Sequence, residues 1–490
     1  MKAILVVLAA SVLWAQPEDA AANSQRAREL VVAGKAEEAI PIYLELAREF
    51  PDNAAILVNL SIAEFKAKHY RDAAAHASAA LRLQPDSPAA NLFLGSSYEE
   101  LGEHLLALPP LERVLAGNPQ ERNARLMLAE ALFNLERYEE AAAHFQKASE
   151  LAPENPKVWY GLGRAFDALS ENAFRQLENA GPESQYWHAL VADQYLRQRR
   201  YGNAFTQYRL ALEVHDTLRG VHAGLATVYE RTGHPAWAGI ETQRELQTGP
   251  DCNKEGLPCD FAERRFREII QFARPATTPE TLYWVYKAYA EMAHGAYSRL
   301  SELPPSLETH LHKAKTFDDE GLPHEAAAEW RKALKLLPGD LRIQTALAWS
   351  LFRAHEFSAA LPVLTELQQK ERDSRELNFL CGATLVNLDE PERAIPPLEA
   401  AIRLDENFLP AHAALGRALL QTSRPEAAIP HLKAALPRDE DASVHFGLLR
   451  AYQLAGRTEQ AVQAKVEYQK ALRAAETKEK LEDGGMITAP

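Results

Sequence analysis

The sequence predicts an all-α solenoid of about twelve antiparallel helix pairs, with an irregular module in the middle. Prolines recur at a constant interval of about 34 residues, the length of one repeat of two helices. They stand at Pro51, Pro85, Pro119 and Pro153, and an alanine precedes each by the same distance, at Ala39, Ala73, Ala107 and Ala141. The chain of 490 residues is also too long for a single compact core. A repeat array satisfies both observations.

A second ladder of small residues keeps the same interval. It consists of Ala27, Ser61, Gly95, Ala129 and Gly163. The pattern resumes at Ala204, Ala238 and Pro250, and again at Ala326, Ala360, Ala394 and Ala428, accompanied by Ala314, Ala348, Gly382 and Gly416. Small side chains are expected where two helices cross, because a large one would force the helices apart. Each pair must stack on its neighbours to bury its apolar faces.

These residues resemble the tetratricopeptide repeat family. The segment NLFLGSSYEELG matches through Leu94, Gly95, Tyr98 and Gly102, and WYGLGRAF matches through Trp159, Leu162, Gly163 and Phe166. The resemblance covers roughly residues 20 to 250 and 305 to 475. It implies a right-handed superhelical solenoid whose first helices line a concave face, and it implies a general binding scaffold rather than one activity.

The repeat interval breaks twice. The separation of Ala141 and Ala204 is five short of two repeat lengths, so the fifth unit should lack a turn or part of a helix. The separation of Ala238 and Ala326 exceeds two repeat lengths by twenty. We expect the extra length to form a loop from Asp251 to Asp260, one helix through FAERRFREIIQFA, and a long helix from Glu280 toward Leu303.

The long helix carries five aromatic residues: Tyr283, Trp284, Tyr286, Tyr289 and Tyr297. A packing seam is the more common role of such a helix, and a recognition element is the alternative. The repeat pattern therefore divides the chain into a signal peptide (1–15), an N-terminal array (16–250), a middle module (251–305), a C-terminal array with its capping helix (306–475) and a disordered tail (476–490).

The first residues, MKAILVVLAASVLWAQ, have the charge and apolar run of a secretory signal peptide, with cleavage expected after Ala15. A buried N-terminal helix is the alternative. We therefore expect a periplasmic or secreted protein with no integral membrane span after cleavage. Cys252 and Cys259 should form a disulfide in an oxidising compartment, although half of a metal site is the other interpretation. Cys381 should be a small core residue.

Charge and motifs argue against several functions. The formal charge is −14, from 54 basic and 68 acidic residues, which disfavours nucleic-acid binding. No GxxxxGK[ST] motif, HExxH motif or GxSxG elbow occurs. His310 and His312 are two residues apart and would face different sides of a helix. We expect no catalytic residues, no cofactor and no metal, and hence no enzyme.

The concave face is where partners are expected. Family members that bind chaperone tails use a clamp of Lys, Asn and Arg; the matching places here hold Ser24, Arg28, Asn59, Ala89 and Phe93, so only the asparagine agrees. Aromatic and arginine residues that anchor partner peptides stand at other concave positions. They are Phe65, Phe133, Tyr160, Arg164, Tyr186, Asp193, Trp349, Phe352, Phe379 and Arg417. The alternative role for several of them is to fill the core between repeats.

The sequence therefore favours a non-catalytic scaffold or adaptor that binds peptide segments of partner proteins in its concave groove. A carbohydrate- or peptidoglycan-associated envelope factor is the first alternative, because aromatic grooves also stack on sugar rings. An unrecognised enzyme is the second. The identity of the partner does not follow from the sequence.

Overall fold

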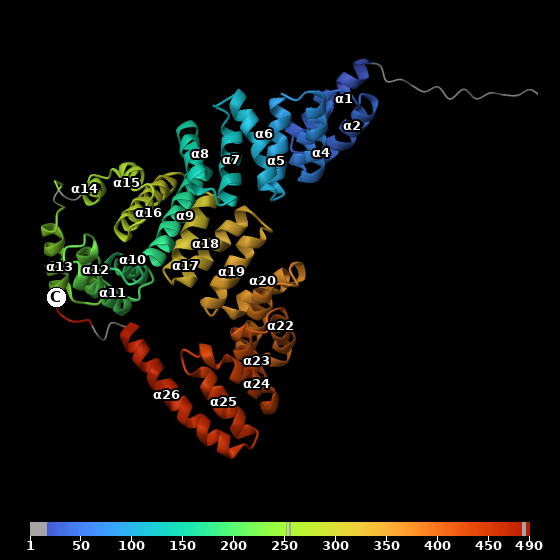
Figure 1. Ribbon diagram of the computed structural model, residues 1–490. Helices are drawn as coiled ribbons and strands as arrows, with labels where there is room; N and C mark the ends of the chain where they lie inside the picture. The colour runs from blue at the N-terminus through green and yellow to red at the C-terminus, as the bar shows by residue number, and fades with distance from the viewer. Residues whose placement is uncertain (1–16, 251, 254–255, 483–486) are drawn as a thin grey trace, which may run out of the picture. The chain divides into compact units, whose positions relative to one another are not determined.

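The structure is a computed structural model that describes residues 17–250, 252–253, 256–482 and 487–490. These residues form 26 α-helices and one 3₁₀ helix, and no strand occurs among them (Figure 1). The all-α repeat fold expected from the sequence is confirmed. The expected signal peptide lies outside the described residues. No described helix is both long enough and apolar enough to cross a membrane.

The chain divides into two compact units. Unit 1 holds residues 1–169 and 293–299, and unit 2 holds residues 170–292 and 300–490. Contacts define these units, so they divide the chain differently from the repeat pattern, which marks boundaries at residues 250 and 305.

Unit 1 is a stack of antiparallel helix pairs. The helices are α1 (Pro17–Val32), α2 (Ala36–Glu49), α3 (Ala54–Lys66), α4 (Tyr70–Leu83), α5 (Pro88–Glu100), α6 (His104–Gly117), α7 (Arg122–Asn134), α8 (Tyr138–Leu151) and the first part of α9 (Pro156–Ala180). From α1 to α8, each helix packs on its partner in the pair and on the next pair.

The turn inside each pair places one residue in the left-handed region, with φ between 58° and 83°. These residues are Gly34, Lys68, Gly102, Glu136, Arg199, Gly233, Gly321, His355, Asp389, Ser423 and Gly456. A non-glycine residue there costs roughly 1–2 kcal/mol, and the packing of the two helices offsets it. The turn is therefore set by the packing of the pair more than by its own sequence.

The ladder of small residues lies at the helix crossings. A Cβ on Gly95 would lie 2.5 Å from Leu111 Cγ, and one on Gly382 would lie 2.4 Å from Leu398 Cγ. In each case a leucine from the second helix of the pair fills the space that glycine leaves. This is the close approach that the sequence predicted.

A polar side chain on the first helix links successive pairs. Asn91, Arg125, Trp159, Asn378 and His412 each lie within hydrogen-bond distance of the carbonyl oxygen six residues earlier. The Trp159 Nε1 to Pro153 O distance, for example, is 2.8 Å. That carbonyl follows the end of the preceding helix and has no partner within it. The hydrogen bond to this carbonyl oxygen thus explains why polar side chains stand at this position of the repeat.

Unit 2 begins with the second part of α9, and two regular pairs follow. They are α10 (Gln185–Arg197) with α11 (Tyr201–Val214), and α12 (Val221–Arg231) with α13 (Pro235–Gln247). The middle module follows, with α14 (Gly256–Ala262), α15 (Phe266–Phe272) and α16 (Pro279–Glu302).

The C-terminal array completes unit 2. Its helices are α17 (Leu307–Asp319), α18 (Pro323–Leu336), α19 (Leu341–Arg353), α20 (Phe357–Lys370), α21 (Arg375–Asn387), α22 (Pro391–Leu404), α23 (Leu409–Gln421), α24 (Pro425–Ala435), the 3₁₀ helix η1 (Leu436–Arg438), α25 (Ser443–Leu454) and α26 (Thr458–Glu482). One apolar core runs through this array and includes Cys381, which is 5% exposed. Burial raises the pKa of its thiol. The core position expected for Cys381 is confirmed.

The fifth repeat lacks a turn. Ser170 stands one repeat length after the left-handed Glu136, but it lies inside α9, which is a single helix of 25 residues ending at Ala180. The two helices of this unit are therefore one helix. This accounts for the shortfall in the repeat interval.

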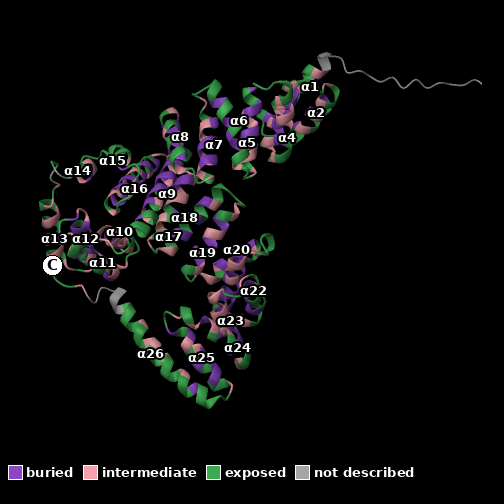
Figure 2. Cartoon of the chain, viewed as in Figure 1, coloured by how far each residue is buried: buried purple, intermediate pink, exposed green. Residues whose placement is uncertain are grey.

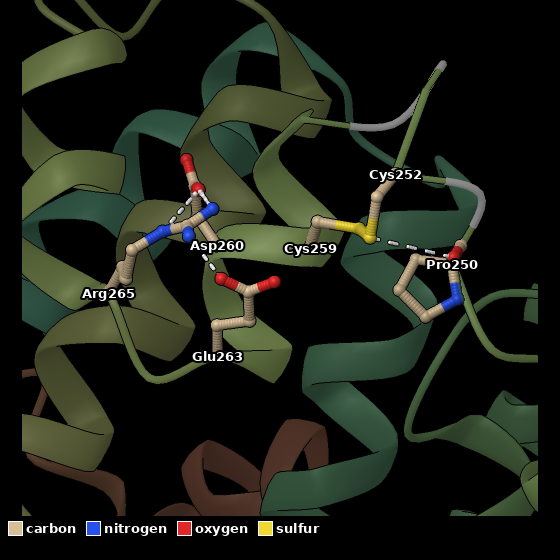
Figure 3. The surroundings of a disulfide bond; sticks show 6 residues. All are labelled: Pro250, Cys252, Cys259, Asp260, Glu263 and Arg265. Carbon is tan, nitrogen blue, oxygen red and sulfur yellow. Dashed lines mark hydrogen bonds and ion pairs between the residues drawn. A yellow bond between two sulfur atoms is a disulfide. The ribbon is translucent and has the colours of Figure 1, made fainter.

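The middle module differs in part from expectation. The long helix α16 was predicted almost to its bounds. The single helix expected through residues 261–273 is wrong, because Arg264 adopts φ 59° and separates α14 from α15. The Arg265 side chain reaches back to Asp260, with Nε 3.0 Å from Oδ1 (Figure 3). The ring of Phe261 packs on that of Phe266. These contacts hold a short helix pair in place of one helix.

The loop expected from Asp251 to Asp260 is also shorter, because α14 begins at Gly256. Cys252 and Cys259 are joined by a disulfide in the structure, with Cα atoms 5.5 Å apart (Figure 3). Cys259 is buried on α14, and Cys252 is exposed. The bond therefore ties the start of the module to its first helix.

The end of the chain is more ordered than expected. The helix α26 extends to Glu482, although a disordered tail was expected from residue 476. Its side chains are largely exposed, as befits a helix that closes an array (Figure 2). A continuous helical sequence without glycine or proline explains the added length. Residues 483–486 of the expected tail lie outside the described residues.

Candidate functional site

Four aromatic side chains follow one another along the C-terminal array. Trp349 and Phe352 lie on α19, Phe379 lies on α21, and Phe408 precedes α23. Ring centroids are 6.5 Å apart for Trp349 and Phe352, 6.4 Å for Phe352 and Phe379, and 5.4 Å for Phe379 and Phe408. All four are half-buried. We call these four residues the aromatic ladder.

Their partial burial is compatible with both partner binding and filling of the core between repeats. Trp349, Phe352 and Phe379 pack against the apolar core with part of each ring. The rest of each ring remains accessible. The sequence predicted these three but missed Phe408, because it precedes its helix and lies outside the concave repeat positions.

A partly buried polar contact fixes α19, the helix that begins the aromatic ladder. Asp318 of α17 accepts hydrogen bonds from Ser350 Oγ at 2.9 Å and from Trp330 Nε1 at 2.8 Å. These two donors lie on α19 and α18, so one carboxylate ties three helices together. Trp349 and Phe352 therefore project from a rigid helix, which suits a recognition surface.

Arginines flank the ladder at its C-terminal end. The Arg375 guanidinium lies 4.6 Å from the Phe408 ring centroid and pairs with Asp405 at 2.5 Å. Arg417, which the sequence placed on the concave face, is exposed on α23 and donates to Asn387 Oδ1 at 3.3 Å. Its guanidinium is thus accessible to an anionic or carbonyl group of a ligand.

Unit 1 brings together three of the predicted residues. The Arg164 guanidinium lies 4.4 Å from the Phe133 ring centroid and 4.9 Å from that of Tyr160. Its Nη2 donates to Glu130 Oε2 at 2.7 Å. Burial acts to lower the pKa of Arg164, but the Glu130 carboxylate outweighs it and the pKa is raised. The guanidinium is therefore a fixed cation within a cage of two rings and a carboxylate.

A tyrosine from the middle module, Tyr297, interacts electrostatically with Arg164. The Tyr297 ring lies over Gly163, where a Cβ would come within 2.4 Å of the ring, and its hydroxyl donates to Asp167 at 2.6 Å. The Arg299 guanidinium lies 5.8 Å from the Trp159 ring centroid. Part of the face expected to bind partners in unit 1 is thus occupied by the chain itself.

Phe65 lies apart from both groups. Its half-buried ring packs edge-on against Phe93 at 5.5 Å and on Tyr70 at 5.4 Å. The contacts join α3 to α4 and α5. They are consistent with the core-filling alternative.

Tyr186 is half-buried against the inserted helix. Its ring lies 5.3 Å from that of the buried Tyr283, which belongs to α16. The expected role of Tyr186 in partner binding stays a prediction. Among the aromatics of α16, Tyr283, Trp284 and Tyr289 are buried, so the packing interpretation of this helix holds for them.

An ion pair holds α16 in place within unit 2. Lys287 Nζ lies 3.1 Å from Asp193 Oδ2, and Tyr208 donates to Asp193 Oδ1 at 2.6 Å. Burial acts to lower the pKa of Lys287, but attraction to Asp193 outweighs it, so the pKa is raised. Asp193, predicted to face the groove, instead anchors the inserted helix.

The comparisons with known proteins agree with this architecture. The tetratricopeptide repeat family matches the chain over residues 24–68, 58–122, 94–156, 126–171, 382–443 and 413–477. The chain belongs to the tetratricopeptide repeat family. Members of this family act as scaffolds for protein interaction, and their repeats are typically non-catalytic.

Several individual proteins are similar over parts of the chain. The small glutamine-rich tetratricopeptide repeat-containing protein 2 of Mycosarcoma maydis is 28% identical over 114 residues, which are 23% of this chain and 32% of that protein. The chain thus matches about a third of that relative's length.

Among solved structures, MamA from Desulfovibrio magneticus is 28% identical, with a TM-score of 0.29, over 31% of this chain and 85% of that one. A tetratricopeptide repeat protein from Parabacteroides merdae is 15% identical, with a TM-score of 0.35, over 68% of this chain and 99% of that one.

The described residues include no cluster of three or more His, Cys, Asp or Glu side chains that could hold a metal ion. His310 is instead paired with Glu329, with Nδ1 2.6 Å from Oε2. The same separation in sequence joins His222 to Glu241 and His412 to His431. These histidines connect the two helices of a pair.

Proposed function

We propose that this protein is a periplasmic or secreted scaffold that binds peptide segments of partner proteins on the aromatic ladder. The observation that carries the proposal is a continuous row of half-exposed rings along the C-terminal array. Aromatic residues in rigid surroundings are the usual anchors of protein interfaces. Extended or helical peptides fit such a groove.

The location rests on the sequence. The apolar segment that precedes Ala15 supports export, and the pair Cys252 and Cys259 supports an oxidising compartment. The formal charge of −14 favours partners with basic segments over nucleic acids.

A peptide-display experiment tests the surface. A random peptide library is selected on residues 16–490, and the affinity of the recovered peptide is measured for the parent and for Trp349→Ala and Phe352→Ala. We expect each substitution to weaken binding about tenfold or more, the effect of losing an interface anchor. Phe379→Leu, which conserves most of the core volume, should weaken binding without unfolding the array.

Phe446→Ala is the matched control, because Phe446 is a 50% exposed aromatic on α25, outside the ladder. It should leave the affinity unchanged. Equal affinities for the parent and all three ladder variants would rule out the assigned surface.

The same exposed ring faces favour one second candidate. They could stack on sugar rings, as in a peptidoglycan-associated factor. Co-sedimentation with purified peptidoglycan that disappears in Trp349→Ala, together with no peptide selected by display, would favour that function.

A further inference from the structure

The C-terminal segment Ile487–Pro490 lies against the second helix pair of unit 2. Tyr229 of α12 donates a hydrogen bond from its hydroxyl to the carbonyl oxygen of Thr488, at 2.8 Å. This contact joins residues 259 positions apart in the sequence. Figure 1 shows the C-terminus beside α12 and α13.

The donor, the Tyr229 hydroxyl, is held in place by the packing of its ring. Tyr229 is fully buried, and its ring packs against Phe205 at 5.9 Å and Trp237 at 5.6 Å. Trp237 is in turn stacked on His234 at 4.3 Å. A buried phenol hydroxyl needs a partner, and the peptide carbonyl supplies it.

The helix α13 is less covered by neighbouring helices than the corresponding helix of the preceding pair. The helix α13 buries a single residue, Glu241, whereas the corresponding helix α11 buries five. Where α11 carries Tyr208 and Ala211, α13 carries Thr242 and Glu245 at the same positions of the next repeat. Its Ile240 and Leu246 are 45% and 80% exposed. The side chains of α13 are thus largely uncovered, and this edge is open.

The last helix directs the chain to this edge. The helix α26 packs against α11, the neighbour of α12. Its Lys478 pairs with Glu440, which precedes α25, at 2.5 Å. The helix thus ends near the pair that Ile487–Pro490 contacts.

We propose that the edge formed by α12 and α13 is a binding site for an extended peptide, and that its occupant is this chain's own segment Ile487–Pro490. The site recognises a backbone carbonyl through Tyr229 and partly covers Ile487 and Pro490, whereas Thr488 and Ala489 are exposed. It is separate from the aromatic ladder and does not depend on the function proposed for that surface. The attached segment blocks the site until a competing peptide displaces it.

A truncated chain tests the proposal. The chain ending at Glu482 is prepared beside the intact one, and a fluorescent peptide with the sequence of residues 484–490 is titrated into both. We expect saturable binding to the truncated chain and at least tenfold weaker binding to the intact chain, whose own segment competes at high effective concentration. In the truncated chain, Tyr229→Phe should weaken binding about fivefold, the effect of one hydrogen bond.

Tyr195→Phe is the matched control, because Tyr195 occupies the same position in the preceding repeat. It should leave peptide binding unchanged. Amide hydrogen exchange supplies a readout that does not need the free peptide: truncation should speed exchange in α12 and α13.

Three outcomes would overturn the proposal. One is unchanged exchange in α12 and α13 after truncation. Another is equal binding of the peptide by the intact and truncated chains. The third is an intact dimer by light scattering that becomes a monomer on truncation, since the occupant would then be a second copy.

Discussion

At the scale of single residues, the positions without a side chain show how tightly the helices cross. Gly382 lies in the middle of α21, where glycine costs roughly 0.5–1 kcal/mol relative to alanine. Glycine is needed there because Leu398 occupies the space that a Cβ would fill. The glycines at the small-residue position of the repeat thus serve close helix packing rather than flexibility.

We expect Gly382→Ala to destabilise the C-terminal array by roughly 1–3 kcal/mol, because overpacking outweighs the gain in helix propensity. Gly295→Ala is the control. Gly295 lies inside α16 with open space where a Cβ would stand, so alanine should stabilise by about 0.5–1 kcal/mol. Urea unfolding followed by circular dichroism measures both. Equal effects of the two variants would contradict the crossing geometry.

His222 should make the stability of the helix pair α12–α13 depend on pH. Its Nδ1 lies 2.5 Å from Glu241 Oε2 and its Nε2 lies 3.0 Å from the carbonyl oxygen of Asp216. The hydrogen bond to Glu241 is the main cause that raises the pKa of His222. The added stability is therefore present below about pH 6.5, the pKa of an unfolded histidine, and is lost as the pH rises through the folded pKa.

We predict that amides of α12 and α13 exchange faster at pH 8 than at pH 6, after correction for the intrinsic rate. His222→Gln should remove this difference. His69→Gln, at an exposed pair with Glu37, should not. A pH response that survives His222→Gln would assign it to another group.

At the scale of elements, the long helix α16 lies outside the repeat pattern and is held by an ion pair with the repeat helix α10. We expect Lys287→Met to loosen α16 and cost about 2–4 kcal/mol, because Asp193 would keep a largely buried charge without its partner. Lys315→Met, at an exposed pair with Asp319, should cost under about 0.5 kcal/mol. Hydrogen exchange in α16 distinguishes the two variants. Equal protection of α16 in both would argue against the Lys287–Asp193 pair as its anchor.

The same helix shows where prediction from sequence reached its limit. The regular interval of prolines and small residues predicted the helix pairs and the irregular fifth unit, because repeat position determines packing. The bounds of α16 were predicted from the extra length of the insertion and its local sequence. The repeat interval could not show that Tyr283 packs on Tyr186 or that Tyr297 lies over Gly163, because both tyrosines belong to α16, which is outside the repeat pattern. Phe408 was not predicted because it precedes its helix, and the contact of Tyr229 was not predicted because Thr488 is 259 positions away in the sequence.

At the scale of the whole molecule, two features point to one compartment. A segment with the pattern of a signal peptide precedes the array, and the disulfide between Cys252 and Cys259 closes a short loop. In the chain-entropy model, closing a loop of this size is worth roughly 2–3 kcal/mol of local stability. That contribution is available only where the thiols are oxidised.

We therefore predict that the protein isolated from its native host begins at Gln16 and carries one disulfide. Its intact mass should equal that of residues 16–490 less two hydrogens. Alkylation should label a single cysteine, Cys381, and only after denaturation, because that thiol is 5% exposed in the folded array. Cys252→Ser should speed exchange in α14 and leave the aromatic ladder unchanged. A protein that retains Met1 and has three alkylatable thiols would place it in a reducing compartment and would remove the basis for an exported scaffold.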